Sequence, residues 1–247
     1  MLTLIGLGLG NHKDITLKGL ERVKKADKVY LDEYTSRFED SARDLENFYG
    51  KKVIRATRDI LESERLVEEA KKENIVLLVV GDALSATTHI DLLMQAKKEN
   101  IEVEVIHNAS ILTAIGTTGL QLYKFGKTTS IPFWKDNYKP ENFYEVLQQN
   151  KSIGAHTLML LDITPERCMT INEAIELLLK TEEKRKEKIF DKTTLCIGCA
   201  RIGSADQKIK AGTAEELMKE DFGEPLHCLI VPGELHFVEE EAITFLR

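Results

Sequence analysis

The sequence has little of what membrane, secreted and nucleic-acid-binding proteins depend on. No apolar run in its 247 residues is long enough to span a bilayer. Its first residues, Met1 to Gly6, lack the basic start and the longer apolar core of a signal peptide. The formal net charge is -7, whereas proteins that bind a phosphate backbone are usually basic. We therefore expect a cytoplasmic protein that binds neither a membrane nor nucleic acid directly.

Cysteine is also scarce, and its spacing gives little support for a metal or redox site. Of the four cysteines, Cys196 and Cys199 form a CxxC pair. A zinc site would need a second pair of ligands, and none with suitable spacing is present. A redox CxxC motif should open a helix, yet the segment from Leu195 to Ile202 has the composition of a strand. We expect reduced cysteines packed in or near strands, and no metal.

Strand and helix patterns alternate along the first half of the chain. Apolar runs that predict strands lie at 2–5, 28–31 and 75–80, with a shorter run at 53–54 and an alternating one at 101–106. Helical patterns occupy 17–23, 41–49, 59–72 and 89–98. This order predicts a parallel or mostly parallel sheet.

A second set of patterns fills the rest of the chain. Strands are predicted at 157–161, 193–202 and 226–231, and helices at 142–149, 171–180, 214–219 and 236–246. The mixed-charge segment from Glu182 to Lys188 is interpreted as a solvated surface. We predict two α/β domains, residues 1–110 and 111–247, with a ligand cleft between them.

The run at 75–80 shows no alternation, which predicts a strand buried on both faces. It ends at Gly81, and the next loop carries the carboxylate of Asp82 and several hydroxyl groups, including that of Ser85. Thr88 and Asp91 have capping-box spacing for the start of the following helix. Open α/β sheets bind ligands at such places, where a strand ends beside a helix N-terminus.

Two of these features allow more than one interpretation. The opening Gly6-Leu7-Gly8-Leu9-Gly10 falls short of a dinucleotide fingerprint, because Asn11 follows it, although Asp32 stands where a ribose-binding acid could lie. It is either part of a nicotinamide or flavin module or a turn that needs glycine for its geometry. Asp82 is either a ligand contact or a cap for nearby backbone amides.

The loop Gly81-Asp82-Ala83-Leu84-Ser85-Ala86-Thr87-Thr88-His89 resembles the GD-x-x-x-ATTH loop of the diphthine synthases. That family belongs to the S-adenosylmethionine-dependent, tetrapyrrole-methylase-like superfamily. The resemblance runs nearly end to end, and its other segments follow in order: Leu4–Leu9, Asp14–Thr16, Val29–Ser36, His107–Ile111, Thr157–Ile163, Ala200–Ser204 and Gly223–His227. Each segment alone is weak evidence, but their order and coverage make the resemblance specific.

The resemblance implies a tetrapyrrole-methylase-like fold and a homodimer. It implies that S-adenosylmethionine is the cofactor and S-adenosylhomocysteine the product. The implied substrate is the 3-amino-3-carboxypropyl-modified histidine of translation elongation factor 2. Repeated transfer to its amino nitrogen gives a trimethylammonium group, and some members of the family also methylate its carboxylate.

The resemblance also implies which residues contact the cofactor. Asp82 corresponds to a position at the methionine part, Leu161 to one on the adenosine, and His227 to one near the adenine. The full set of implied cofactor-binding residues is Leu9, Asp82, Ser85, Ser110, Ile111, Leu161, Ile202 and His227.

No paired carboxylates and no Ser-His-Asp set stand out, so no catalytic residue is assigned. His89, His107 and His156 lack metal-ligand spacing and are interpreted as structural or surface residues. This suits methyl transfer from a sulfonium, in which the cofactor carries the reactive group and the protein positions the reactants. Three alternatives remain open: a tetrapyrrole (precorrin-type) methyltransferase, a nucleotide-dependent oxidoreductase and a binding-only module.

Overall fold

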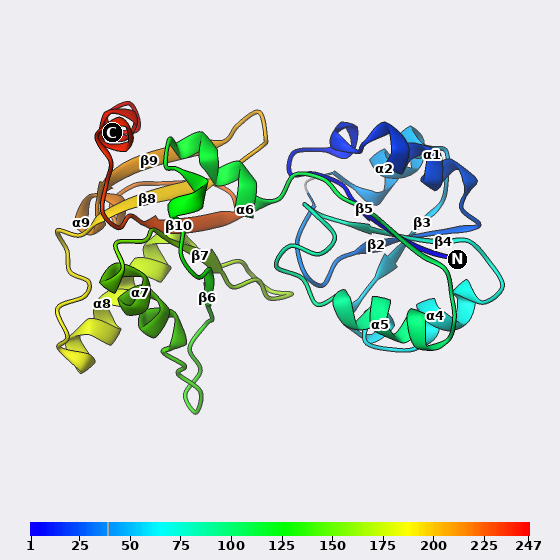
Figure 1. Cartoon of the computed structure of the whole chain (residues 1–247), viewed down its shortest axis with the longest axis horizontal. Helices are drawn as coiled ribbons and strands as arrows, with labels where there is room; N and C mark the ends of the chain where they lie inside the picture. The colour runs from blue at the N-terminus through cyan, green and yellow to red at the C-terminus, as the bar shows by residue number, and fades with distance from the viewer. Residues whose placement is uncertain (39) are drawn as a thin grey trace. The chain divides into compact units, whose positions relative to one another are not determined.

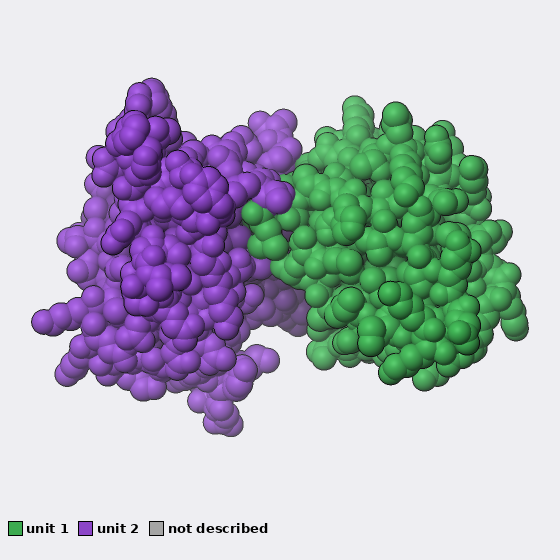
Figure 2. Space-filling model, in the orientation of Figure 1, with its two compact units in different colours: residues 1–112 green, residues 113–247 purple. Residues whose placement is uncertain are grey.

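The computed structural model describes residues 1–38 and 40–247. The chain forms two compact units, Met1–Leu112 and Thr113–Arg247, which Figure 2 distinguishes by colour. Each unit is built on its own sheet with helices packed against it (Figure 1). Both units are therefore α/β, which confirms the predicted fold class.

The first unit contains a five-stranded sheet in the order β3-β2-β4-β1-β5. Its strands are β1 (Leu2–Gly6), β2 (Lys28–Asp32), β3 (Val53–Ala56), β4 (Ile75–Val79) and β5 (Val103–Ile106). All four neighbouring pairs are parallel, as the alternating pattern predicted. Every residue of the central strand β4 is buried, whereas most of the edge strand β5 is only half-buried. This difference explains why the sequence of β4 is continuously apolar, whereas that of β5 alternates between apolar and polar residues.

Helices cover both faces of this sheet (Figure 1). On one face, α1 (Leu17–Lys25) and α2 (Ala42–Tyr49) bury Val23 and Leu45 against Ile5. On the other face, α4 (Arg65–Ala70) and α5 (Ile90–Lys98) bury Leu66 and Leu93 against Leu4 and Leu77. Two shorter helices complete the unit, η1 (His12–Asp14) and α3 (Arg58–Leu61). The sheet thus lies between two apolar layers, and the loops that follow its strands lie at the edge of the sheet.

Two local predictions for this unit are wrong. The helix expected over 59–72 is interrupted between α3 and α4. The hydroxyl of Ser63 donates to the Ile60 carbonyl at 2.9 Å and accepts from the Arg65 amide at 3.3 Å, so a side chain competes there with the helical backbone. The capping box at Thr88 is also absent, because His89 is the N-cap of α5 and no side chain caps it.

The second unit contains a five-stranded sheet in the order β6-β7-β10-β8-β9. Its strands are β6 (Thr129–Ile131), β7 (Thr157–Leu161), β8 (Leu195–Ala200), β9 (Lys208–Thr213) and β10 (His227–Val231). Strands β6 and β7 are parallel, and the other neighbours are antiparallel. Strand β9 was not predicted from the sequence; it is an edge strand that opens with Lys208-Ile209-Lys210. The two lysines pair with Glu220 instead of showing an apolar strand pattern.

Helices α7 (Asn142–Ser152), α8 (Ile171–Arg185) and α9 (Ala214–Leu217) pack on this sheet. Leu147, Ile175 and Leu217 bring one residue from each of them into a common core with Met159 and Leu229. The remaining helices are α6 (Ile111–Ala114), η2 (Ile115–Thr118), η3 (Leu122–Lys124) and α10 (Phe237–Thr244). Within the described residues, no helix combines the length and the apolar character needed to cross a membrane.

The mixed-charge segment is not simply a solvated surface. Helix α8 extends through its first part, and Glu182 is half-buried. The Glu182 carboxylate accepts a hydrogen bond from the hydroxyl of Tyr144 at 2.6 Å and from the amides of Lys188, Ile189 and Phe190 at 2.8–3.1 Å. Burial raises the pKa of Glu182, but these donors outweigh it and lower the pKa to about 2. The residue therefore fixes the turn that follows α8.

Candidate functional site

The five candidate residues of the first unit gather at one edge of its sheet. Strands β4 and β5 pair in parallel with β1 on its two sides, so the carboxyl ends of all three strands lie at the same edge of the sheet. Leu9 follows β1, Asp82 and Ser85 follow β4, and Ser110 and Ile111 follow β5. The strand order therefore assembles these loops at the place where parallel sheets bind ligands.

Hydrogen bonds tie these loops to one another. Gly8 and Gly81 exchange two backbone bonds, of 3.1 Å and 2.7 Å. The side-chain amide of Asn108 donates to the carbonyls of Gly6 at 3.0 Å and Asp14 at 2.9 Å. No role was expected for Asn108, because its partners lie far away in the sequence. This residue fastens the loop after β5 to the loop after β1.

The carboxylate of Asp82 is buried and fully engaged within the chain. Its Oδ1 accepts from the Leu84 amide at 3.0 Å and the Ser85 hydroxyl at 3.2 Å. Its Oδ2 accepts from the Asn108 amide at 3.1 Å and bonds Nδ1 of His107 at 2.8 Å. Burial raises the pKa of Asp82, but these donors lower it overall, so the group is a carboxylate. Since a carboxylate has about four acceptor positions, a ligand cation would have to displace one partner.

The other groups of this loop hold it in place. The hydroxyl of Thr87 donates to the Ala83 carbonyl at 2.8 Å, so it does not cap α5. His89 is buried, with Nδ1 at 3.1 Å from the same carbonyl and Nε2 at 3.2 Å from Oδ2 of Asp32. His89 thus connects the loop after β4 to the end of β2, in keeping with its predicted structural role.

Asp32 is not available to a ribose hydroxyl. Only 1% of its surface is exposed, and its oxygens accept from the amides of Tyr34 at 2.7 Å and Thr35 at 3.1 Å and from the Thr35 hydroxyl. Burial raises the pKa of Asp32, but His89, Thr35 and the Tyr34 amide lower it overall. The feature that supported a dinucleotide module is therefore a buried structural carboxylate.

The three candidate residues of the second unit lie together at one edge of its own sheet. Leu161 ends β7, and His227 begins β10, which pairs with β7 in antiparallel fashion. His227 is also the register partner of Ala200, the last residue of β8, and Ile202 follows two positions later. Leu161, Ile202 and His227 are all buried. Residues that are distant in the sequence are thus brought to one place.

His227 has one bonded and one unbonded ring nitrogen. Its Nε2 lies 3.0 Å from the Glu224 carbonyl, which can only accept, so Nε2 carries the hydrogen. The buried Nδ1 is then an acceptor, and it has no partner within the described residues. Burial lowers the pKa of His227, which favours this neutral form. An unsatisfied buried acceptor marks a place for a donor from a ligand.

Arg201 organises the loops around His227. Its guanidinium donates to the carbonyls of Phe222, at 2.9 Å, and Glu224, and it pairs with Asp206 at 2.6 Å. The Glu224 carbonyl thus accepts from both Arg201 and His227. The segment Ala200–Ser204 had been noted for its resemblance, but no role was expected for the arginine itself.

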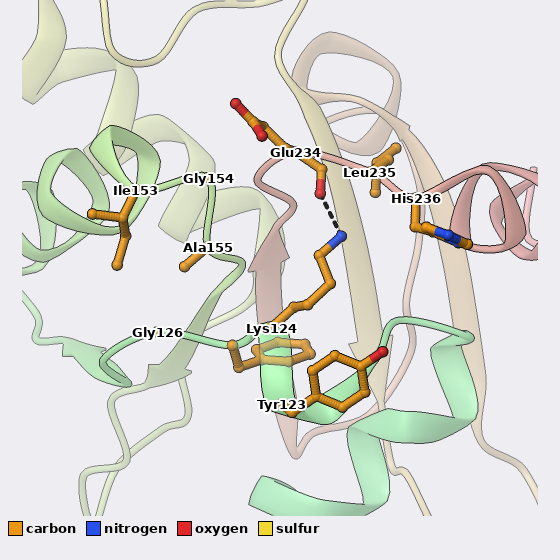
Figure 3. Close-up of a pocket in the computed structure, with 10 residues that line it drawn as sticks. Tyr123, Lys124, Gly126, Ile153, Gly154, Ala155, Glu234, Leu235 and His236 are labelled. Atoms are coloured by element: carbon orange, nitrogen blue, oxygen red, sulfur yellow. Dashed lines mark hydrogen bonds between the residues drawn. The ribbon is translucent and has the colours of Figure 1, made fainter.

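A pocket of about 490 Å³ also lies in the second unit, away from these residues (Figure 3). Its wall includes Tyr123, Ile153 and His236, and inside it Lys124 Nζ donates to the Glu234 carbonyl at 2.6 Å. None of the eight candidate residues lines it. Lys124 also pairs with Glu239, so the one cation in the wall is already neutralised by the chain.

The cysteines lie where the strand pattern predicted. Cys196 and Cys199 are buried in β8, and Cys228 is buried in β10 as the register partner of Cys199. Cys196 and Cys199 are three residues apart on a strand, so they point to opposite faces of the sheet. All four cysteines are free thiols, and burial raises the pKa of Cys196 well above its ordinary value.

Gly81 lies against two of the candidate residues. This residue has φ +76°, and an added Cβ would find its nearest neighbours, the Ala109 carbonyl and the Leu9 side chain, at 3.8 Å and Ser110 at 3.9 Å. Leu9 and Ser110 thus lie at van der Waals distance from this position, next to the buried charge of Asp82. In the second unit, the free acceptor of His227 suits an amino group such as that of adenine.

Comparison with known proteins places the chain in one family. A family model described as tetrapyrrole (corrin/porphyrin) methylases matches residues 1–218. A diphthine methyl ester synthase from Dictyostelium discoideum is 47% identical, and the match covers 100% of this chain and 98% of that protein. A diphthine synthase from Methanocaldococcus jannaschii is also 47% identical, with the same coverage. A solved structure of a diphthine synthase superposes with a TM-score of 0.91 at 41% identity, covering 99% of this chain and 95% of that one.

Proposed function

The chain belongs to the tetrapyrrole methylases and, among them, to the diphthine synthases, and from this premise we propose its substrate and its cofactor. It is a methyltransferase of diphthamide biosynthesis. The proposed substrate is the 3-amino-3-carboxypropyl-modified histidine of translation elongation factor 2. The proposed methyl donor is S-adenosylmethionine, which leaves as S-adenosylhomocysteine.

We propose that Leu9, Asp82, Ser85, Ser110 and Ile111 bind the methionine part of the cofactor. The ammonium group would replace the Ser85 hydroxyl on Oδ1 of Asp82, because that bond is the longest of the four that the carboxylate accepts, at 3.2 Å. A bond between an ammonium and a carboxylate is stronger than one from a neutral hydroxyl. Oδ2 of Asp82 would keep its bond to His107.

In the second unit, Leu161, Ile202 and His227 would bind the adenosine part. The buried apolar side chains of Leu161 and Ile202 suit the face of the base, and Nδ1 of His227 suits a donor such as the adenine amino group. When bound, the cofactor supplies a methyl group on a positively charged sulfur. The chain then has to hold the reactants close together and exclude water.

The observation that carries the proposal is the convergence of three loops at the ends of β1, β4 and β5. They bring the side chain of Leu9 and the backbone of Ser110 close to Gly81, next to a buried carboxylate. The buried Asp32 argues against the nicotinamide or flavin alternative, because a ribose would find no free acceptor there.

The number and position of the methyl groups are a further part of the proposal. We propose repeated transfer to the amino nitrogen of the modified histidine, which gives a trimethylammonium group. The relative from Dictyostelium discoideum is named for a methyl ester, so a further transfer to the carboxylate is part of the proposal. We also propose that the chain acts as a homodimer in the cytoplasm, where elongation factor 2 works.

Mass spectrometry of the modified histidine after reaction tests this function. The purified chain, S-adenosylmethionine and elongation factor 2 that carries the aminocarboxypropyl group should give the trimethylated residue, with or without the ester. A free precorrin-type tetrapyrrole should neither accept methyl groups nor compete. Transfer to the tetrapyrrole, with none to the factor, would assign the chain to the other branch of its family.

Calorimetry tests the cofactor separately from the substrate. S-adenosylhomocysteine should bind with measurable heat, and NAD at the same concentration should give none. A bound ligand also stabilises the folded state by mass action, by about 2.7 kcal/mol at a hundred times its Kd. If millimolar S-adenosylhomocysteine gives neither heat nor a rise in Tm, the proposed cofactor is wrong.

A further inference from the structure

The exposed histidine at the end of β5 is held by a buried carboxylate. His107 Nδ1 lies 2.8 Å from Oδ2 of Asp82. The side chain of His107 is 67% exposed, whereas that of Asp82 is 8% exposed. The carboxylate is itself fixed by the amides of Leu84 and Asn108, so it cannot turn away from the ring.

This bond determines which ring nitrogen carries the hydrogen. A carboxylate can only accept, so Nδ1 of His107 must be the donor. In the neutral ring, Nε2 is then left with a lone pair. Within residues 1–38 and 40–247, this Nε2 makes no hydrogen bond. A proton acceptor of fixed orientation thus faces the surface beside Ser110, at the edge where the candidate loops meet.

We propose that His107 is a catalytic residue, the general base that removes a proton from the substrate's amino group before methyl transfer. This inference rests on the proposed function. An alkyl amine is largely protonated at neutral pH and has no lone pair to attack a methyl group. Nε2 takes the proton, the N–H bond breaks, and its electron pair stays on the amine nitrogen. The exposed ring then passes the proton to water.

The other histidines near candidate residues cannot do this. Both ring nitrogens of His89 face acceptors, and the ring is 3% exposed. Nε2 of His227 is bonded to a carbonyl, and its Nδ1 is buried. His107 alone among these three combines an orienting carboxylate with an accessible lone pair. The sequence alone had suggested a structural or surface role for His107, because Asp82 and His107 are 25 residues apart and only the strand order brings them together.

Nitrogen NMR of the imidazole rings tests the geometry without any activity measurement. In ¹⁵N-labelled protein with S-adenosylhomocysteine bound, the neutral His107 ring should carry its hydrogen on Nδ1. The signal is assigned by its loss in His107→Asn. A ring protonated on Nε2 instead would overturn the proposal, because that nitrogen could not then accept a proton.

Substitution separates the base from a merely structural residue. His107→Asn can still donate to Asp82 but cannot take a proton, so it should bind S-adenosylhomocysteine within about twofold of wild type. Its kcat for amine methylation should fall by about a hundredfold or more, since general bases contribute typically 10²–10⁴-fold. His107→Ala should lose activity likewise and regain part of it in added imidazole. His236→Asn, which changes an exposed histidine outside the site and keeps a residue that caps helices, should change neither quantity.

The outcomes decide between the two proposals. If His107→Asn keeps its kcat within about threefold, or if imidazole restores nothing to His107→Ala, His107 is not the base. If His107→Asn loses affinity for S-adenosylhomocysteine as strongly as it loses activity, its role is in binding. If wild-type protein transfers no methyl group to the factor, the proposed function fails before the variants are compared.

Discussion

Oε1 of Glu239 lies 3.1 Å from Nε2 of His156, and neither side chain has any exposed surface. The amide of Gly233 donates to Nδ1 of this histidine at 2.9 Å, so Nε2 carries the hydrogen and donates to the carboxylate. Glu239 also accepts from the Gln121 amide at 2.8 Å and from Lys124 at 2.5 Å. The network fastens α10 to the start of β7 and to η3.

This network makes stability depend on pH. Burial lowers the pKa of His156, although Glu239 opposes the shift, so the folded ring resists protonation more than the unfolded ring does. Burial raises the pKa of Glu239, but its donors outweigh it and lower the pKa to about 2 from 4.5. Both contributions are complete at high pH and are lost on acidification, because the unfolded state then binds more protons. The free energy of unfolding, measured by urea titration, should therefore decrease as the pH drops below about 6.5. It should decrease further as the pH drops below about 4.5. In His156→Gln the upper part of this decline should be smaller, with the remainder due to His227, whose pKa burial also lowers, and an unchanged decline would contradict the assignment.

Removing the carboxylate should destabilise the second unit severely. Glu239→Ala leaves Lys124, the ring of His156 and the Gln121 amide without their acceptor, and breaking a buried ion pair typically costs 3–5 kcal/mol. Glu240→Ala changes an exposed glutamate on the same helix and should stay within about 0.5 kcal/mol of wild type. Urea unfolding of both variants provides the comparison, and equal losses would mean that the network contributes nothing.

Asp82→Asn should lower both stability and affinity for the cofactor. Each carboxylate oxygen accepts from one backbone amide, that of Leu84 or Asn108, and asparagine can offer an oxygen to only one of them. The other amide is left buried without a partner, which costs about 1–3 kcal/mol. Affinity for S-adenosylhomocysteine should fall at least tenfold, because the negative charge is gone.

The control for Asp82→Asn is Asp91→Asn, an exposed position at the start of α5, which should change neither property. Chemical denaturation and calorimetry measure the two effects independently. If Asp82→Asn is destabilised but binds S-adenosylhomocysteine within about twofold, Asp82 is a structural residue only.

Gly81→Ala and Gly50→Ala form a matched pair. The two glycines have φ +76° and +66°, and an added Cβ meets nothing closer than 3.8 Å at Gly81 and nothing within 4 Å at Gly50. Both variants should therefore lose a similar amount of stability, about 1–2 kcal/mol, from the left-handed backbone conformation. Only Gly81→Ala should weaken S-adenosylhomocysteine binding, because its methyl group enters the space beside Leu9 and Ser110. If the two variants bind S-adenosylhomocysteine with equal affinity, the cofactor does not bind beside Gly81.

The strands that position the site could be predicted because burial leaves a strong mark on their sequence. The apolar run that forms β4 has no alternation, and every residue of the strand is buried. The loop after it was placed at the sheet edge for the same reason. Edge strand β9 was not predicted, because Lys208 and Lys210 form ion pairs with Glu220 and leave the strand with little apolar pattern.

The bonds within the site could not be predicted, because they join loops that only the folded sheet brings together. Nothing in the sequence around Asp82 indicates that His107 and Asn108 fill one of its oxygens. For Asp32, spacing suggested a ligand-binding acid, yet its bonds to Tyr34 and Thr35 and its contact with His89 make it structural. Spacing gives the position of a side chain along a strand, but the neighbouring loops decide what that side chain binds.

The side chain of Asn108 has a consequence for the order in which this edge of the sheet opens. Because one amide group holds the carbonyls of both Gly6 and Asp14, the loops after β1 and β5 cannot separate from each other while it stays bonded. Amide hydrogens on both loops should then exchange with solvent in a single cooperative opening. Because these loops are already held in place, binding of a small molecule should require little further ordering of the chain. The association rate constant should then be limited by diffusion.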